Sequence, residues 1–402
     1  MIYQNLAVFA AFLLFYSVFA GRFESRLVNG PLMFSLVGLL LGPHVFGLLN
    51  ITIVGHASHI RLLAELTLAI VLFTDAANAN VSVLRQSNAI PIRLLLIGLP
   101  LTLLCGWAFG MLIFNDMPWL EVAILSTVLA PTDAALGKAV VSNAAVPRPT
   151  REALNVESGL NDGICVPVLF IILALLAPEE LHTGTVALSF QFIVEEIGIG
   201  AATGSALALL SVTSMKFSIK QGYEMPVWRQ LTMPGLALLA FAAAQWFGGS
   251  GFISAFMCGL ITGMRIRKHK HGYLISNEGY GELLSVLVWM VFGAVVIGMA
   301  WPSITWQSWL YAISSLTVLR MLPVWISLLG TNLSIESRLF IGWFGPRGLA
   351  SIVFIVIVLQ NPLIAKKEIA ATVICTILMS VILHGVTANP WVNRLKQIGS
   401  ME

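Results

Sequence analysis

Residues 157–163 read Glu-Ser-Gly-Leu-Asn-Asp-Gly, and they lie near the start of a longer apolar run, NVESGLNDGICVPVLFIILALLA, at residues 155–177. A run of this length is typical of a helix that crosses a lipid bilayer, which needs about 17–25 mostly apolar residues. Two carboxylates, Glu157 and Asp162, therefore lie where a membrane would surround them. Such charges are rare in membrane helices and usually have a functional role.

Similar apolar runs recur along the whole chain. Of its 402 residues, 58% are hydrophobic and only 10% are charged, whereas soluble domains carry about 25% charged residues. We therefore expect an all-α polytopic membrane protein that forms a single domain over residues 1–402. Its thirteen expected transmembrane helices are residues 4–20, 30–49, 62–77, 92–114, 119–141, 155–177, 190–213, 229–247, 251–265, 280–300, 305–329, 339–360 and 368–389.

The basic residues predict an orientation, because membrane proteins concentrate Lys and Arg in cytoplasmic segments. With the N-terminus outside and the C-terminus cytoplasmic, three basic residues fall outside: Arg61, Lys366 and Lys367. Seventeen fall inside: Arg22, Arg26, Arg85, Arg93, Lys138, Arg148, Arg151, Lys216, Lys220, Arg229, Arg265, Arg267, Lys268, Lys270, Arg338, Arg394 and Lys396. These residues alternate with the apolar runs and form no basic patch, so we do not expect a nucleic acid partner.

Six charges lie within the expected spans: Asp75, Asp133, Glu157, Asp162, Arg320 and Arg347. Four acids against two bases leave two carboxylates without a cationic side chain. A buried carboxylate without such a partner must take up a proton or a cation. The excess therefore indicates cation chemistry. Asp75 fits either a site carboxylate or an interfacial acid that water reaches.

Within residues 157–163, positions four apart share a helix face. Glu157 and Asn161 form one stripe, and Ser158 and Asp162 form a second about 100° away. The second stripe offers a hydroxyl and a carboxylate, which are hard oxygen ligands suited to a cation such as Na⁺. The alternative is a structural helix N-terminus, where Glu and Ser are also common.

Two expected spans are interrupted by proline, at LAPTDA (residues 129–134) and at FGPRG (residues 344–348). Paired interruptions in two halves are typical of transporters built from inverted repeats, here spans 1–6 and 8–13, with two crossed discontinuous helices. Asp133 could offset the positive helix ends and Arg347 the negative ones. Ordinary proline kinks are the alternative.

Four motifs together resemble the monovalent cation:proton antiporter-1 family of NhaP-type and NHE-type exchangers: PTDAALG (131–137), ESGLNDG (157–163), VLRMLPV (318–324) and FGPRGLAS (344–351). The resemblance implies an NhaA/NapA-like fold, a homodimer in membrane lipid, and no enzymatic activity or cofactor. It implies electroneutral exchange of Na⁺ (or Li⁺) for H⁺ by elevator-like alternating access, in sodium and pH homeostasis. A bacterial-type inner membrane is the expected location.

The same resemblance suggests a division of the chain. Residues 1–80 and 229–300 would form a scaffold and dimerisation part, and residues 90–177 and 305–392 an ion-binding core. Residues 190–213 would be the linker helix. We expect no soluble C-terminal domain, although many members of the family have a cytoplasmic tail.

Carried over by motif, Asp162 binds cation and proton in turn, with Asn161 as its motif partner. The resemblance also implies that Ser158 and Thr132 would be Na⁺ ligands, Thr132 through its backbone carbonyl, with Asp133 beside it at the helix break. Glu157 and Arg320 form a structural ion pair, which would leave Asp162 free to titrate. One departure concerns Asp75, because the family often has Glu in an FEGG-like setting and this chain has FTDAA.

Three alternatives remain. A K⁺/H⁺ antiporter would use the same scaffold and oxygen ligands. A cation channel could use the buried acids as a selectivity filter. An intramembrane serine protease could use Ser250 within GGSG (248–251) and His384 as its base, but it explains neither the carboxylates nor the broken helices.

Overall fold

The computed structural model is helical, and no strand occurs in the part of the chain that it describes. The structure describes residues 2–23, 30–51, 53–79, 90–133, 136, 140, 143, 146–176, 185–266, 270–298, 301–359, 364 and 366–399. Five of the basic residues used for the orientation lie outside these ranges: Arg26, Arg85, Lys138, Arg267 and Lys268. Most of the second half of the interrupted span at 119–141 also lies outside them.

The helices follow in the order α1 (Ile2–Phe23), α2 (Gly30–Leu41), α3 (Ile53–Asn78), α5 (Ile90–Arg93), η1 (Leu94–Gly98), α6 (Leu99–Ile113), α7 (Trp119–Val128), α9 (Arg148–Leu175), α10 (Thr185–Gln221), α11 (Pro226–Trp246), α12 (Gly251–Arg265), α13 (Lys270–Val291), η3 (Phe292–Ile297), η4 (Trp301–Ser303), α15 (Trp306–Leu316), α16 (Val318–Ser327), α17 (Ile335–Trp343), α18 (Leu349–Val358) and α19 (Lys366–Gly399).

Each of the thirteen expected spans overlaps one of these helices or a consecutive set of them. Among the described residues, seven helical stretches are long and apolar enough to cross a membrane, and four apolar helices of 10–17 residues are shorter. Two of the short ones, α7 and α18, lie beside the proline-containing interruptions. The all-α polytopic fold is therefore confirmed, and the helices are short at the two proline-containing interruptions that the sequence analysis predicted.

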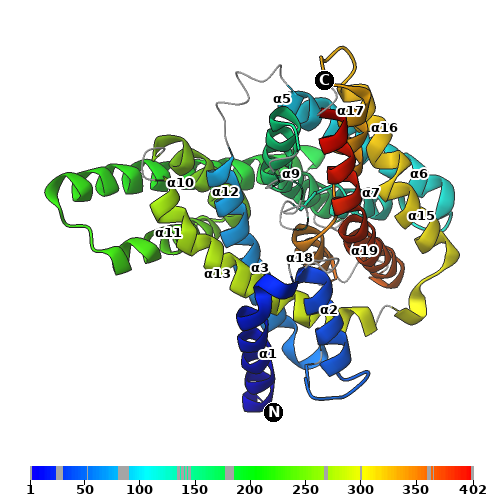
Figure 1. Ribbon diagram of the computed structural model, residues 1–402, viewed down its shortest axis with the longest axis horizontal. Coiled ribbons are helices and arrows are strands. Elements are labelled where there is room, and N and C mark those ends of the chain that lie inside the picture. The colour runs from blue at the N-terminus through cyan, green and yellow to red at the C-terminus, as the bar shows by residue number, and fades with distance from the viewer. Residues whose placement is uncertain are drawn as a thin grey trace.

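The helices gather in two groups (Figure 1). Helices α10 to α13 lie together with α3 on one side, and α5 to α7, α15 to α17 and α19 lie on the other. Helices α9 and α18 lie between them, and each contacts α3 as well as α7. These two middle helices follow or contain the motifs at residues 157–163 and 344–351, so the motifs lie where the two groups meet.

Close packing within the first group depends on two glycines of α12. A Cβ at Gly259 would lie 2.2 Å from the Phe73 carbonyl oxygen, and one at Gly263 would lie 2.1 Å from the Ala77 carbonyl oxygen. The backbones of α12 and α3 can approach this closely only because both positions lack a side chain. Helix α3, which carries Asp75, is thereby held against α12.

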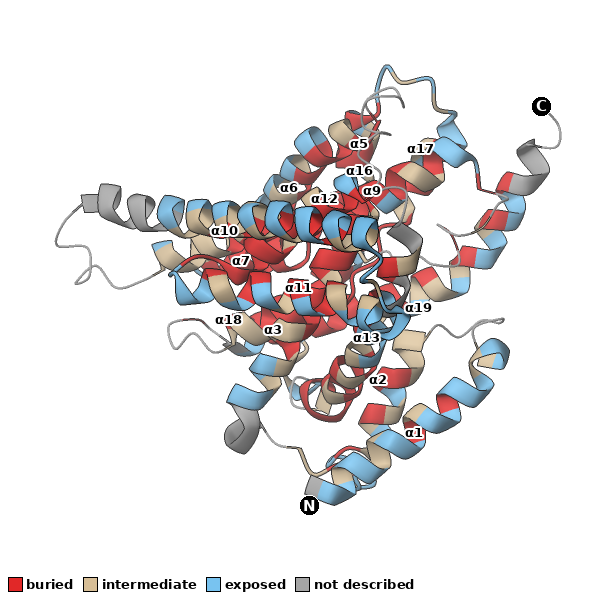
Figure 2. Ribbon diagram, turned by 90° about the vertical axis from the view of Figure 1, so that its left-hand side faces the viewer, coloured by how far each residue is buried: buried red, intermediate tan, exposed pale blue. Residues whose placement is uncertain are grey.

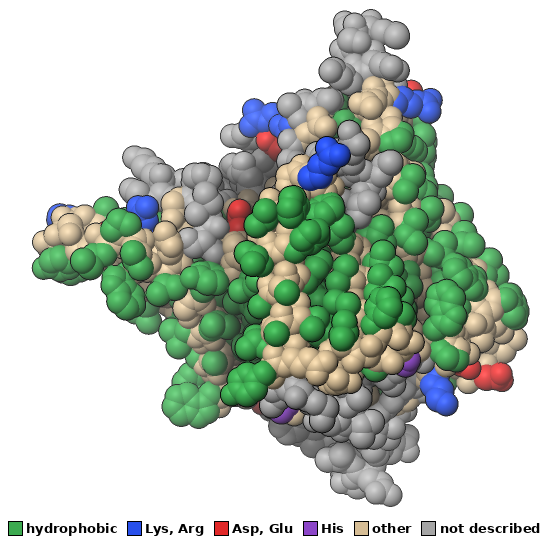
Figure 3. Space-filling model, turned by 60° about the horizontal axis from the view of Figure 1, so that its bottom comes forward, with side chains coloured by type: hydrophobic (Ala, Val, Ile, Leu, Met, Phe, Trp, Pro, Cys, Tyr) green, Lys and Arg blue, Asp and Glu red, His purple; other side chains and the backbone are tan. Residues whose placement is uncertain are grey.

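The outer surface is rich in apolar side chains. Buried residues concentrate where the helices meet, whereas the outer faces of α1 and α10 are mostly exposed (Figure 2). Leu112 is 78% exposed and Trp246 is 85% exposed, and hydrophobic side chains cover much of the face in Figure 3. Apolar patches of this extent are unusual on soluble proteins and are typical of a surface that lipid covers.

Candidate functional site

The two interrupted helices meet at their breaks. Helix α7 ends at Val128, and the chain continues without helical structure through residues 131–133. Helix α17 ends at Trp343, and α18 begins at Leu349 after another non-helical stretch. The Asp133 backbone N–H donates to the Pro346 carbonyl over 2.8 Å. Non-helical backbone at membrane depth is tolerated where protein buries it, and each break here is covered by the other.

Each break supplies a charge to the helix of the other break. Arg347 Nη1 donates to the carbonyl oxygens of Ala130 at 2.7 Å and Pro131 at 3.2 Å, just beyond the C-terminal end of α7. Asp133 Oδ2 accepts a 2.9 Å hydrogen bond from the backbone N–H of Leu349, the first residue of α18. A cation at a helix C-terminus and an anion at an N-terminus both oppose the helix dipole. The two charges therefore stabilise two helix ends that belong to different halves of the chain.

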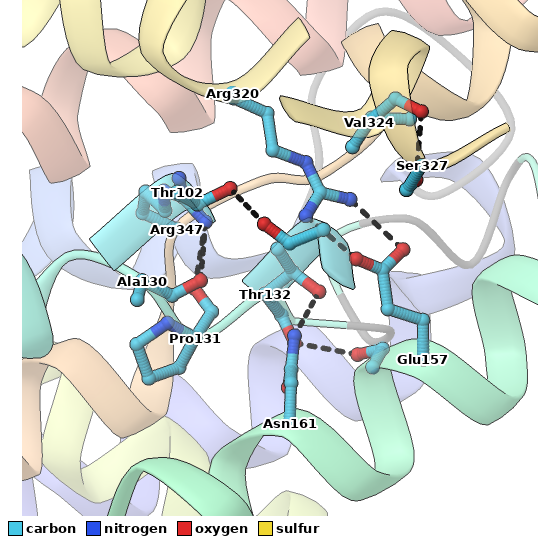
Figure 4. Close-up of polar contacts among 12 residues, drawn as sticks. Thr102, Ala130, Pro131, Thr132, Glu157, Asn161, Arg320, Val324, Ser327 and Arg347 are labelled. Atoms are coloured by element: carbon cyan, nitrogen blue, oxygen red, sulfur yellow. Dashed lines mark hydrogen bonds and ion pairs between the residues drawn. The ribbon is translucent and has the colours of Figure 1, made fainter. Parts of the chain in front are cut away.

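Glu157 of α9 and Arg320 of α16 form a bidentate ion pair. Arg320 Nη1 donates to Glu157 Oε1 at 2.6 Å, and Nη2 donates to Oε2 at 2.9 Å (Figure 4). Both side chains are about 2% exposed. Gly345 allows the guanidinium to approach the second break, because a Cβ there would lie 2.5 Å from Arg320 Nε. The pair thus joins α9 and α16 beside the broken helix.

Thr132 is the point where the first break meets α9. Ser158 Oγ donates to the Thr132 carbonyl oxygen at 2.6 Å. Asn161 Nδ2 donates to Thr132 Oγ1, also at 2.6 Å (Figure 4). The sequence analysis assigned Ser158 and Asn161 to separate stripes, but the structure directs both to one residue, because positions three apart on a helix are also neighbours.

Asp162 is 5% exposed and lies beside this cluster on α9. Its Oδ1 atom has no hydrogen-bond partner among the described residues. The carboxylate interacts electrostatically with Asp75, Asp133 and Arg347. A buried carboxylate oxygen without a donor is costly unless it takes up a proton or a cation.

Asp75 lies on α3, half-buried, against the same part of α9. A Cβ at Gly159 would lie 3.1 Å from the Asp75 carbonyl oxygen, so the two backbones are close. Asp75 interacts electrostatically with Asp133 and with Glu278 and Glu282 of α13. The structure therefore brings Asp75 into the acidic neighbourhood of Asp162, although the two readings of its role stay open.

The sequence analysis missed the polar face of α13. Asn277 is fully buried, and its Nδ2 donates to Thr74 Oγ1 at 2.6 Å, one residue before Asp75. Glu278 accepts a 3.0 Å hydrogen bond from Asn78 Nδ2. The acids at 278 and 282 are four residues apart and lie next to an apolar run. Because residues four apart share a helix face, this spacing could have predicted an acidic face on the helix.

The residues of the protease alternative have other contacts. Ser250 Oγ caps α12 by accepting from the Ile253 N–H at 3.4 Å. Both ring nitrogens of His384 contact groups of α17 and α19, at Trp343 and Ser380. Ser250 is therefore explained by the cap of α12, and His384 by its contacts within α19 and with the end of α17.

Comparison with known proteins agrees with this arrangement. The pattern of the family described as "Sodium/hydrogen exchanger, transmembrane" matches residues 8–394. The K(+)/H(+) antiporter NhaP2 of Shewanella baltica is 24% identical over 379 residues, which are 92% of this chain and 63% of that protein. The chain thus spans about 63% of the length of this relative. The Na(+)/H(+) antiporter of Schizosaccharomyces pombe is 22% identical over 429 residues, covering 96% of this chain and 89% of that protein.

Among solved structures, the sodium proton antiporter MjNhaP1 from Methanocaldococcus jannaschii superposes with a TM-score of 0.79 at 22% identity. The match covers 98% of this chain and 99% of that one, so the two share a fold. The family match extends over nearly the whole chain and includes both helix breaks and the motif of α9. The chain therefore belongs to the transmembrane sodium/hydrogen exchanger family, the monovalent cation:proton antiporters, which are membrane transporters.

Proposed function

We propose that this protein exchanges Na⁺, or Li⁺, for H⁺ across the membrane, with Asp162 as the carboxylate that binds them in turn. The observation that carries the proposal is the buried Asp162 Oδ1, which has no hydrogen-bond partner among the described residues. Asp162 follows Asn161 and lies one helical turn after Ser158, and both of these residues contact Thr132. Carbonyl, hydroxyl and carboxylate oxygens are the ligands that a hard cation prefers. A cation would replace the hydrogen bond from Ser158 to Thr132 and bind both oxygens.

Exchange without leak follows from the cost of burying an uncompensated charge. When the site moves between the two sides of the membrane, Asp162 must carry either a cation or a proton. One cation then replaces one proton, and the exchange is electroneutral. The Glu157–Arg320 pair supports this scheme because Arg320 is already neutralised and does not hold Asp162 in its charged form.

The movement that we propose is elevator-like. Helices α1 to α3 and α11 to α13 would be the static scaffold and dimer part, and α10 would be the linker helix. Helices α5 to α7, α9 and α15 to α19 would carry the site. We also propose that the protein is a homodimer in a bacterial-type inner membrane. Its N-terminus would be outside and its C-terminus cytoplasmic, as the basic residues indicate.

Proton movement in proteoliposomes with an imposed pH gradient tests the exchange. Na⁺, Li⁺ and K⁺ are added in turn to the native protein, to Asp162→Asn and to Asp116→Asn, which makes the same change in an exposed turn. We expect Na⁺ or Li⁺ to collapse the gradient with the native protein and with Asp116→Asn, but not with Asp162→Asn. No response to any cation in the native protein would rule out antiport.

The second candidate is K⁺/H⁺ exchange at the same site. It is favoured by the names of several relatives, among them the NhaP2 proteins of Shewanella, which are K(+)/H(+) antiporters. Collapse of the gradient by K⁺ alone, lost in Asp162→Asn, would establish this candidate. Flux that did not saturate with cation concentration and moved no protons would instead indicate a channel.

A further inference from the structure

His384 is a buried histidine on α19 that the exchange scheme leaves without a role. Its side chain is 2% exposed, and it lies against the second helix break. Its Nε2 atom is 2.8 Å from the carbonyl oxygen of Trp343, the last residue of α17. Its Nδ1 atom is 3.2 Å from Ser380 Oγ and 2.8 Å from the Ser380 carbonyl oxygen.

Ser380 connects His384 to Arg347, which lies on the other side of the break. Its hydroxyl oxygen accepts a 2.7 Å hydrogen bond from the backbone N–H of Arg347. The hydroxyl proton is then free to be donated to His384 Nδ1, and the shorter approach of Nδ1 to the Ser380 carbonyl oxygen then makes no hydrogen bond. A ring that carries its single proton on Nε2 can donate that proton to Trp343. Three hydrogen bonds thus run from Arg347 through Ser380 and His384 to the end of α17.

We propose that neutral, Nε2-protonated His384 is a positioning residue for the cation site, and this inference rests on the proposed function. Together with Ser380, it ties both sides of the second break to α19. It therefore fixes the backbone of Arg347, whose guanidinium holds the carbonyls of Ala130 and Pro131. The next residue is Thr132, whose carbonyl is a proposed cation ligand. His384 acts on the site through this sequence of contacts and does not touch the cation.

The neutral state follows from the charges around the ring. His384 interacts electrostatically with Arg347 and Arg320, and the rings of Trp343 and Phe344 pack beside it with centroids 5.4 Å and 6.1 Å away. A second ring proton would donate to the Ser380 carbonyl, but it would add a third buried positive charge to this region. Burying a charge without a countercharge is costly.

Four variants test the proposal, and each is measured for cation concentration at half-maximal rate, maximal rate and thermal unfolding. His384→Leu and Ser380→Ala leave buried polar groups unpaired, so we expect roughly a tenfold rise in the half-saturating cation concentration. His384→Gln supplies an acceptor and a donor, and it should stay within about threefold of native. The double variant His384→Leu/Ser380→Ala should have a half-saturating cation concentration no higher than that of the more impaired single variant. Both substitutions interrupt the same series of hydrogen bonds, so their effects should not add.

Thr376→Val is the matched control. Thr376 is fully buried one turn before Ser380, and its hydroxyl donates within α19 to the Thr372 carbonyl. Its replacement should leave the half-saturating concentration unchanged. A merely structural role of His384 would lower the unfolding temperature or the maximal rate and leave cation affinity as it was. Trp343 Nε1 donates to Thr387 Oγ1 at 2.9 Å, and none of the substitutions removes either group, so we expect α17 to stay attached to α19 in the variants.

Three results would overturn the inference. One is a native half-saturating concentration in His384→Leu while the native protein transports normally. Another is a shift of the activity-versus-pH curve in His384→Gln, because a neutral ring contributes no titration. The third is a ¹⁵N spectrum in which the signal lost in His384→Gln is that of a doubly protonated ring. If the native protein itself shows no exchange, the proposed function fails first, and the spectrum alone still tests the protonation state of the ring.

Discussion

At the scale of single residues, Glu157 and Arg320 show how a charge is held inside this protein. Their two hydrogen bonds of 2.6 Å and 2.9 Å satisfy the carboxylate and most of the guanidinium fork. A buried ion pair adds little net stability, but removal of one partner leaves an uncompensated charge and costs about 3–5 kcal/mol. We therefore expect the protein to lose more stability when one of the two charges is removed than when both are removed.

Glu157→Gln should lower the thermal unfolding temperature and move the activity-versus-pH curve to lower pH. The freed Arg320 would favour the charged form of Asp162, so a higher proton concentration would be needed to compete with the cation. Glu152→Gln is the matched control, since it breaks the Arg148–Glu152 pair of the same helix at the surface. Exposed pairs are worth about 0–1 kcal/mol. An unmoved pH curve in Glu157→Gln would show that the pair does not set the proton competition.

The sequence predicted these two residues as partners through the family motifs, and their contact is present. It did not predict that Ser158 and Asn161 both reach Thr132. A helical stripe fixes which side chains share a face, but it leaves open what lies opposite that face. The opposite group here is supplied by a non-helical stretch, whose path depends on the second break and therefore on residues more than 200 positions away.

At the scale of elements, the packing of α12 against α3 depends on the missing side chains of Gly259 and Gly263. An added methyl group would have to push backbone against backbone, because its nearest neighbours are carbonyl oxygens at 2.1–2.2 Å. Helix α3 would then move and carry Asp75 away from α9. The spacing of the two glycines, four positions apart, can be read from the sequence, but the helix that they contact cannot.

Gly259→Ala should destabilise the protein by about 1–3 kcal/mol, as overpacking does in other cores. Gly235→Ala on α11 is the control, since a Cβ there meets nothing within 4 Å. This change should be neutral or slightly stabilising, because alanine favours a helix more than glycine. Thermal unfolding in detergent measures both. Equal melting temperatures for the two variants would contradict the close approach of α12 and α3.

At the scale of the whole molecule, the site is completed by both halves of the chain. Composition and the spacing of apolar runs predicted an all-helical membrane protein, and the two proline-containing motifs predicted where the helices break. The same motifs predicted that Asp133 would offset positive helix ends and Arg347 negative ones, and the structure places Arg347 at the end of α7 and Asp133 at the start of α18. They did not predict which atoms meet, such as the hydrogen bond from the Asp133 N–H to the Pro346 carbonyl, because that contact depends on how the two halves pack.

The chain can be divided at Gly222, an exposed turn residue with φ of +70° between α10 and α11, to test this dependence. Residues 1–222 and 223–402, each expressed alone, should show no exchange, whereas their coexpression should restore it. Exchange activity in vesicles measures the outcome. The Asp162→Asn form of the first fragment should fail to restore exchange when coexpressed. Activity of the first fragment alone would show that its break is complete without the second half.

The crossed charges also set an order of events during synthesis. A ribosome completes residues 129–133 long before residues 347–349 exist, so the carbonyls after α7 first enter the bilayer without the arginine that later binds them. The first break can therefore reach its final form only after the second half has been inserted. Maturation of the transport site is a late, post-insertion step, and the newly made first half depends in the interval on water, lipid headgroups or the insertion machinery for those hydrogen bonds.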